Sequence, residues 1–232
     1  MKSKTTDFKI EGGKKLSGTI DTNTSKNSAV VLLCASLLNK NRTVLKKMPR
    51  IEEVSRIIEV LESIGVKTSW KKGNDLEIIP PKKINLSGLN MQSAVKTRSI
   101  MMFLGPLIHS FKKFNLPHAG GCRLGKRTVA PHFFALEKMG VKIGTSENSY
   151  MVAVKKLRPA EIVLYESGDT VTANAIMAAA KISGATTIKF ASANYQVQDF
   201  CFFLLKFGVE IEGIGTTTLV IHGVPEMNQD ME

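Results

Sequence analysis

LEKMGVKI, residues 136–143, has the pattern of the end of an amphipathic helix, a glycine and the start of a strand. A glycine directly after the last apolar residue of a helix can adopt the left-handed conformation that ends the helix. The same pattern recurs in LESIGVKT (61–68) and LLKFGVEI (204–211), at intervals of about 70 residues, and self-similarity at a regular interval indicates repeated units. The sequence therefore predicts three copies of one structural unit.

Each copy extends in both directions into the same order of elements. Two β-prone runs around a polar turn follow each glycine and predict a hairpin. Before each amphipathic helix lies one strand, and before that strand lies a helix that is apolar almost all round. A further strand ahead of the apolar helix would complete a β-α-β-α-β-β unit. The stretches expected to form these first strands are GTIDT (18–22), INLSG (84–88) and IVLYE (162–166).

The three units fill about residues 17–85, 86–157 and 158–224. This order predicts an α/β (α+β) protein with a single domain over residues 23–232, preceded by a strand segment at residues 1–22. A helix that is apolar all round must be enclosed by its neighbours. We therefore expect the three apolar helices to pack together with pseudo-threefold symmetry, with helices inside and sheets outside.

Under that symmetry, the N-terminal ends of the three apolar helices converge. Helix N-termini carry free backbone N–H groups and a partial positive charge, and several of them together favour an anion. Small polar residues lie at each end, where their ordinary role is to cap the helix. They are Thr24, Ser25 and Asn27 in the first unit, Ser93 and Thr97 in the second, and Ser167, Thr170 and Thr172 in the third.

Two cations lie close to these helix starts. Lys26 occupies the first turn of the first apolar helix, where a lysine has the wrong sign for the helix dipole. Arg98 has a similar placement in the second unit. A solvated side chain is the ordinary explanation for such a position, but a cation beside free N–H groups is also what a phosphate or carboxylate requires. The pattern predicts an anion site.

The overall charge agrees with a small anionic ligand or simply with a basic surface. The 232 residues carry a formal net charge of +12, but the lysines are dispersed and only 6% of residues are aromatic. No stacking platform for nucleic acid is visible. Neither a membrane-length apolar run nor the apolar region of a secretory signal is present. We expect a cytoplasmic protein that binds neither nucleic acid nor membranes.

One of the three cysteines lies in an unusual setting. Cys34 and Cys201 fall in apolar runs and are interpreted as small core residues, whereas Cys122 lies in HAGGCRLGKRTVAPH (118–132) among glycines and cations. Nearby cations favour the thiolate, so we expect Cys122 to be a functional thiol. The four histidines are scattered, without the i and i+4 spacing of metal ligands. No metal or cofactor is expected.

These residues together resemble the enolpyruvyl transferase family, in the branch that uses UDP-N-acetylglucosamine. The resemblance rests on the triple unit, SKN (25–27) before an apolar helix, TRSIMMFLGPL (97–107), and GGCRLGKR (120–127) followed by Val129 and His132. It covers the whole chain, and the Gly-Gly-Cys loop separates this branch from the shikimate-phosphate branch. The resemblance implies the family's inside-out α/β barrel.

The resemblance also implies an activity: transfer of the enolpyruvyl group of phosphoenolpyruvate to the 3-hydroxyl of UDP-N-acetylglucosamine, the first committed step of peptidoglycan synthesis. By position, Cys122 would be the general acid that protonates the phosphoenolpyruvate methylene carbon. Lys26 and Asn27 would bind phosphoenolpyruvate. The residues implied for the UDP-sugar are Arg98, Arg127 and Val129.

The chain departs from the family pattern at three places. RTVA (127–130) replaces Arg-Pro-Val-Asp, so a proline and a carboxylate are missing there. ESGDT (166–170) replaces the Ser-Val-Gly-Ala-Thr stretch that touches the uridine, and NYQVQD (194–199) lacks the usual paired glutamates. The uridine contacts of the third unit are therefore not carried over.

The resemblance further implies a missing partner domain. Members of the family have two domains of three units each, which close over the substrates, and this chain contains three units. The second domain would supply the aspartate that accepts the sugar hydroxyl proton, and the first strand, about residues 8–22, would pack on it. We expect the chain alone to be inactive, with a separate C-terminal half as a candidate partner.

Two other functions remain open from the sequence. A non-catalytic protein that binds sugar nucleotides or a protein partner would explain the missing half, although the set of Lys26, Arg98, Cys122 and Arg127 argues against it. An enzyme like the RNA 3′-phosphate cyclases, which resemble the same repeat unit, would explain the charge of +12. The cysteine loop and the few aromatic residues count against that alternative.

Overall fold

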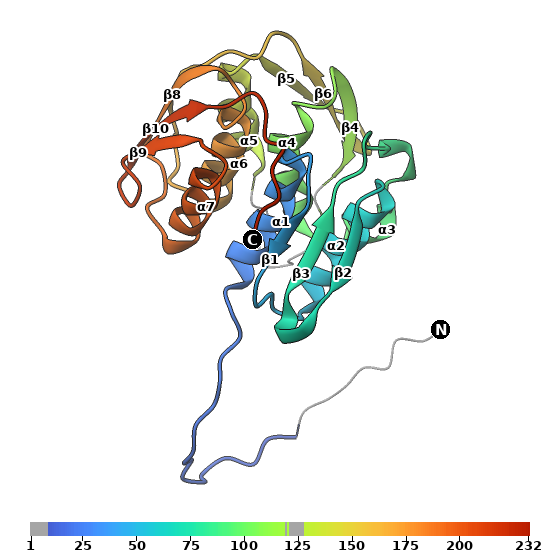
Figure 1. Cartoon of the computed structure of the whole chain (residues 1–232), viewed down its shortest axis with the longest axis vertical. Helices are drawn as coiled ribbons and strands as arrows, with labels where there is room; N and C mark the ends of the chain where they lie inside the picture. Colours follow the sequence, from blue (N-terminus) through green and yellow to red (C-terminus); the bar gives the residue numbers. More distant parts are fainter. Residues whose placement is uncertain (1–8, 119, 121–127) are drawn as a thin grey trace.

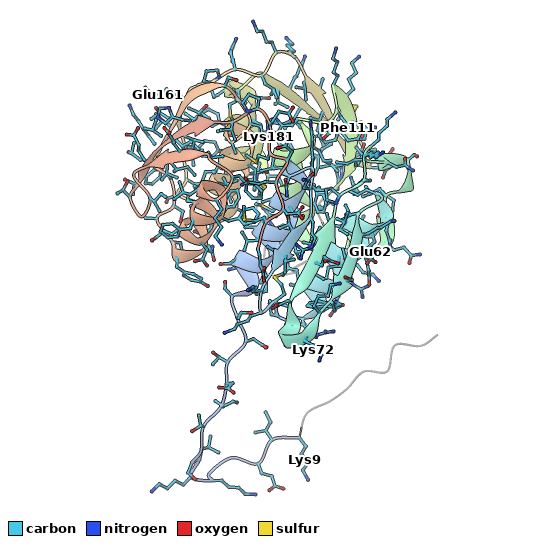
Figure 2. All side chains as sticks on the ribbon, viewed as in Figure 1. Lys9, Glu62, Lys72, Phe111, Glu161 and Lys181 are labelled. Carbon is cyan, nitrogen blue, oxygen red and sulfur yellow. The ribbon has the colours of Figure 1, made fainter. Side chains whose placement is uncertain are left out.

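Three small β-sheets surround a group of helices in the computed structural model, which describes residues 9–118, 120 and 128–232 (Figure 1). The sheets lie at the periphery and the helices fill the middle, so the expectation of helices inside and sheets outside is confirmed. Figure 2 shows side chains filling the space between these layers, with Lys9 at the end of a segment that stands away from them.

The first unit follows the predicted order from its apolar helix onward. Its apolar helix is buried over most of its length because it packs against α2 of the same unit and against α6 and α7 of the third unit. The elements are α1 (Lys26–Ala35), a 3₁₀ turn (Ser36–Leu38), β1 (Thr43–Leu45), α2 (Glu52–Ser63), β2 (Lys67–Trp70), a 3₁₀ turn (Lys72–Asn74) and β3 (Leu76–Ile79).

In the second unit the apolar segment is broken into short pieces. The elements are a 3₁₀ turn (Leu86–Gly88), α3 (Met91–Ala94), η4 (Arg98–Phe103), α4 (Leu104–Leu107), β4 (Lys113–Pro117), α5 (Ala130–Lys138), β5 (Val141–Thr145) and β6 (Ser149–Val154). The expectation of one apolar helix in the second unit is therefore wrong. Thr97 leaves the helical conformation and its side chain caps the next turn by accepting from the amide of Ser99 at 3.1 Å.

The third unit contains every element of the predicted unit. Its apolar helix α6 is buried from Val171 to Ala179 and packs against α1, α4, α5 and α7. The elements are β7 (Glu161–Val163), α6 (Asp169–Ala179), β8 (Gly184–Lys189), α7 (Tyr195–Leu205), β9 (Glu210–Glu212) and β10 (Thr218–Gly223).

The three glycines that define the repeat end their helices as predicted. Gly65, Gly140 and Gly208 have φ values of 102°, 97° and 82°, in the left-handed region where glycine meets no Cβ penalty. After α2, the amide of Val66 donates to the carbonyl of Leu61 at 3.1 Å, the wrapped hydrogen bond of a glycine-ended helix. Each helix therefore turns directly into the first strand of a hairpin.

The sheets repeat one pairing pattern. Their strand orders are β1-β3-β2, β4-β6-β5 and β7-β8-β10-β9. In each sheet the second hairpin strand lies in the middle and pairs antiparallel with the strand that precedes the amphipathic helix. The third sheet has a fourth strand at its edge, because β7 pairs parallel with β8. The common order confirms that the three units share one topology.

Two of the three expected first strands are absent among the described residues. Residues 9–22 contain no strand, and residues 84–88 contain only the 3₁₀ turn Leu86–Gly88, which Asn85 caps by accepting from the amide of Ser87. The described part of the segment expected at residues 1–22 therefore contains no strand in the chain alone. A strand requires a partner edge, and this segment extends away from the domain with Ile10, Leu16 and Ile20 exposed (Figure 1).

Residues 225–232 lie beside β1. Met231 forms a parallel bridge with Thr43, and the Val44 amide donates to the Met231 carbonyl at 2.8 Å. The arrangement matches β7 beside β8, which is also parallel. Met227 and Met231 are buried, so the segment is packed between the third and first units (Figure 1).

The inner helices approach closely at a glycine. A Cβ added to Gly105 would lie 2.6 Å from Met177 Cβ and 2.7 Å from Asn174 Oδ1, so α4 and α6 tolerate no side chain there. Asn174 is buried in this contact and accepts from the Gly105 amide at 2.7 Å.

Within the described ranges, no helix has both the length and the apolar character that crossing a bilayer would require.

Candidate functional site

A cleft of about 1160 Å³ opens where the helices of the three units begin. It is bounded by the starts of α1, α2, η4, α6 and α7, with Thr128 and His132 from the region of α5. This arrangement follows from the repeat, because topologically equivalent helices begin on the same side of the domain. The predicted convergence of helix N-termini is therefore present in the structure, and backbone N–H groups meet there.

The charge of the cleft is mixed among the described residues. The cations in its lining are Lys26, Arg56, Lys96 and Arg98, and the acids are Glu52, Glu53, Glu166 and Asp169. The sequence predicted Lys26 and Arg98 and missed the other two cations and the four acids. Lys26 and Arg56 already have carboxylate partners, so an anion that binds to either of them must share or replace such a partner.

Lys26 is held by such a partner. Its Nζ lies 2.7 Å from Glu53 Oε2, which joins the start of α1 to the start of α2. The other Glu53 oxygen accepts hydrogen bonds from Ser99 Oγ and, at 3.2 Å, from Thr97 Oγ1. Burial by itself raises the pKa of Glu53, but these bonds outweigh it and hold the pKa below its usual range. Glu53 is therefore ionised at neutral pH.

Arg98 connects the start of η4 to the backbone just ahead of α5. Its Nη2 donates to the carbonyl of Thr128 at 2.8 Å. Thr128 Oγ1 in turn accepts from the amide of Ala130 at 3.1 Å, at the start of α5. Arg98 thus fixes the backbone between the loop and the helix, and it lines the cleft at the same time.

His132 is a buried imidazole in the cleft wall. Its Nδ1 lies 3.0 Å from Asn174 Nδ2, which also donates to the Met101 carbonyl at 2.9 Å. Since the Asn174 amide nitrogen can only donate, Nδ1 is the acceptor and the imidazole proton lies on Nε2. Burial, with a smaller contribution from Arg98, lowers the pKa of His132 to about 4. The side chain is neutral at physiological pH.

The predicted site residues fall into three groups. Lys26, Asn27 and Arg98 line the cleft, and so do Thr97, Ser167 and Thr170. Val129 is the N-cap residue of α5, next to the cleft residue Thr128. Cys122 and Arg127 lie outside the described residues.

The remaining polar residues predicted at the helix starts have structural partners. Ser25 accepts from the amide of Ser28 at 3.2 Å, as an N-cap does. Thr24 Oγ1 donates to the Lys47 carbonyl at 2.6 Å, and Ser93 Oγ donates to Glu59. Thr172 is buried and accepts from the amide of Ser192 at 3.0 Å. For these four residues the capping or packing interpretation describes the structure.

Selective alkylation of Cys122 is expected when the folded protein is treated briefly with iodoacetamide. Cys34 and Cys201 are completely buried, and burial raises the pKa of both thiols, to about 12 for Cys201. Thiolates are the reacting species, so both should react slowly. Mass spectrometry of peptides after short exposure would locate the label. First labelling of Cys34 or Cys201 would contradict the assignment of the loop.

Known proteins resemble this chain in both sequence and fold. The profile of the EPSP synthase (3-phosphoshikimate 1-carboxyvinyltransferase) family matches residues 10–232. The fold is similar to the enolpyruvyl transferase NikO from Streptomyces tendae, with a TM-score of 0.81 at 20% identity over 95% of this chain and 52% of that chain. An EPSP synthase from Acinetobacter baumannii gives a TM-score of 0.69 at 15% identity, covering 92% of this chain and 48% of that chain.

The chain therefore belongs to the EPSP synthase family of enolpyruvyl transferases. Within the family it is similar to proteins named UDP-N-acetylglucosamine 1-carboxyvinyltransferase. The protein of that name from Bradyrhizobium diazoefficiens is 36% identical over 214 residues, 92% of this chain and 49% of its own length. The protein of that name from Chlorobaculum parvum is 36% identical over 222 residues, which are 94% of this chain and 52% of its own length. The chain spans about half the length of the curated relatives it matches.

Proposed function

We propose that this chain is the cysteine-bearing half of an enzyme that transfers enolpyruvyl from phosphoenolpyruvate to the 3-hydroxyl of UDP-N-acetylglucosamine. The observation that carries the proposal is the cleft at the converging helix starts, which brings together Lys26, Asn27 and Arg98 from two units. Both substrates are anions. A cleft with backbone N–H groups and exchangeable cations suits them.

The reaction divides between an addition and an elimination. The sugar 3-hydroxyl adds to C2 of phosphoenolpyruvate while Cys122 gives its proton to C3, which forms a tetrahedral intermediate. Loss of a proton from C3 and of phosphate from C2 then gives the enolpyruvyl ether. Cys122 is the general acid of the first step, and a general base must accept the hydroxyl proton. The described residues position the substrates for these steps.

The ion pair between Lys26 and Glu53 suggests how phosphoenolpyruvate is accepted. Lys26 is about half exposed and Glu53 less so, so the lysine can turn to a ligand while Glu53 keeps its bonds to Thr97 and Ser99. An incoming phosphate or carboxylate would share or replace the carboxylate partner of Lys26. The cation is held in place before the substrate arrives, which lowers the cost of ordering its side chain.

Arg98 and the backbone after Arg127 are proposed to hold the sugar nucleotide. Arg98 already fixes Thr128, and Val129 begins the helix that carries His132. The proposal includes the first committed step of peptidoglycan synthesis, a cytoplasmic location, and a separate polypeptide that supplies the three other units of the enzyme. It includes no metal or cofactor.

Preferential binding of UDP-N-acetylglucosamine over a short RNA is expected in titrations at matched ionic strength. The cations gather at helix starts, and the described residues that line the cleft include no Phe, Tyr or Trp on which the bases of single-stranded RNA could stack. Substitution of Arg98 by alanine should weaken the UDP-sugar complex about tenfold, the effect of losing one charge-assisted contact.

The matched control is Arg158→Ala, because Arg158 is an exposed arginine that lies outside the cleft. This variant should bind the UDP-sugar as the parent chain does. Tighter binding of RNA than of the UDP-sugar, with affinity that falls steeply as salt rises, would reject the proposed function in favour of an enzyme acting on RNA ends.

A further inference from the structure

Three polar side chains form a chain of hydrogen bonds along one wall of the cleft. Asp169, in the first turn of α6, accepts from Gln196 Nε2 through its Oδ2. Gln196 Oε1 accepts from Asn27 Nδ2 at 3.0 Å. All three residues line the cleft, and they come from α6, α7 and α1. Gln196 is only 4% exposed, so it lies buried between an exposed asparagine and a half-buried aspartate.

The aspartate sets the direction of this chain. The two ends of a glutamine amide have the same shape, but one end donates and the other accepts. An ionised carboxylate only accepts, so Asp169 binds the nitrogen end of Gln196 and leaves the oxygen end toward Asn27. Asp169 is itself held by Ser192 Oγ at 2.5 Å and by Asn194 Nδ2 at 3.3 Å. Because the Gln196 oxygen can only accept, the Asn27 atom that faces it must be the donor, which is the amide nitrogen.

We propose that Asp169 is a positioning residue that acts through Gln196 to aim the Asn27 amide at the anionic substrate. One hydrogen of Asn27 Nδ2 is committed to Gln196. The same nitrogen carries a second hydrogen, which donates to the anion. Naming that anion as phosphoenolpyruvate rests on the proposed function; the direction of the hydrogen bonds does not. A hydrogen bond to a charged group contributes enough free energy that a wrongly oriented Asn27 amide would measurably weaken the binding of the anion.

Both controlling residues lie in stretches where this sequence departs from the family pattern. Asp169 belongs to ESGDT (166–170), and Gln196 belongs to NYQVQD (194–199), which lacks the usual paired glutamates. The structure gives these departures a common explanation. A neutral glutamine facing Asn27 needs an acceptor-only neighbour to orient it, and Asp169 supplies that acceptor from the adjacent helix.

An exchange of the charged and neutral residues tests the proposal without a change of shape. In Asp169→Asn the neighbour can donate or accept, so Gln196 loses its fixed direction. In Gln196→Glu two carboxylates meet, which is unfavourable for both. In the double variant Asp169→Asn with Gln196→Glu, the introduced amide can donate to the introduced carboxylate, which still accepts from Asn27. We expect each single variant to bind phosphoenolpyruvate about tenfold more weakly, and the double variant to return to within about threefold of the parent.

Side-chain amide NMR on the whole chain provides both readouts. In the parent, the Asn27 and Gln196 amide hydrogens should exchange slowly, and phosphoenolpyruvate titrated in the presence of UDP-N-acetylglucosamine should shift the Asn27 signal. Asp169→Asn should speed exchange at both residues, and the double variant should restore protection at Asn27. The matched control is Gln198→Glu, since Gln198 lies on the same helix and donates to the Ala193 carbonyl instead.

The outcomes separate the two proposals. If the parent binds phosphoenolpyruvate and Asp169→Asn binds it equally well, Asp169 does not position Asn27 and the inference is wrong. It is equally wrong if the double variant stays as weak as the single variants. If the parent shows no response to phosphoenolpyruvate, the proposed function fails, and with it the ligand named here.

Discussion

Enolpyruvyl transfer by the 232-residue chain on its own is expected to be undetectable in a phosphate-release assay. The cleft contains Lys26, Asn27 and Arg98, and the chain carries Cys122. The chain nevertheless spans only about half the length of the curated relatives that it matches. A general acid without its general base commonly loses a factor of about 10² to 10⁴ in rate, roughly 3 to 5 kcal/mol. The other wall of the site would also be missing.

The second contribution is the larger one. Positioning of two substrates and exclusion of water are worth up to about 7 to 11 kcal/mol by effective-molarity estimates. A cleft open on one side cannot supply that share. A separately expressed C-terminal half of one of the relatives should restore phosphate release. The restored rate should require both substrates and should disappear in Cys122→Ala.

The control for this experiment is the chain mixed with an unrelated protein at the same concentration. Turnover by the lone chain that Cys122→Ala abolishes would show that one half suffices. Binding of the UDP-sugar without turnover in any reconstituted mixture would favour the non-catalytic alternative that the sequence left open.

Substitution of Asn174 by alanine is expected to destabilise the folded chain by about 3 to 5 kcal/mol. Asn174 is 1% exposed and bonds to three groups: the Gly105 amide, the Met101 carbonyl and His132 Nδ1. Alanine leaves all three in a dry interior, and each unsatisfied group costs about 1 to 3 kcal/mol, partly recovered by water. The measurement is the free energy of unfolding from a urea titration.

Asn115→Ala is the matched control, since Asn115 is exposed on β4, and it should change the unfolding free energy by less than about 0.5 kcal/mol. Asn174→Ala should also perturb the cleft, because His132 loses the bond that fixes its tautomer. An unfolding free energy within about 1 kcal/mol of the parent would mean that water replaces all three bonds, and the described packing around Gly105 would then be wrong.

The repeat could be predicted because its signals are local. A glycine at the end of an amphipathic helix fixes where the helix stops, and Gly65, Gly140 and Gly208 do so in the structure. The first strands of units one and two were predicted wrongly because a strand depends on a partner edge, which local sequence does not show. The middle strands β3, β6 and β10 form at the predicted places, since each is one arm of a hairpin.

The candidate site could be predicted only where a single residue carries the signal. Lys26 was found because a cation in the first turn of a helix is unfavourable, and it does line the cleft. Its partner Glu53 lies in the first turn of a different helix, where an acid is ordinary. Gln196 and Asp169 stood out only as departures from the family pattern, because their roles depend on contacts between α1, α6 and α7.

The segment 225–232 beside β1 has a consequence for how the chain acquires its fold. Met231 bridges Thr43, so the first sheet acquires its parallel neighbour from residues far along the chain. Bringing together two positions so distant in sequence costs loop-closure entropy, and contacts of this kind slow folding. On the ribosome, β1 keeps an unpaired edge until residue 231 has emerged. This unpaired edge of β1 is therefore open to wrong strand pairing during nearly the whole synthesis of the chain.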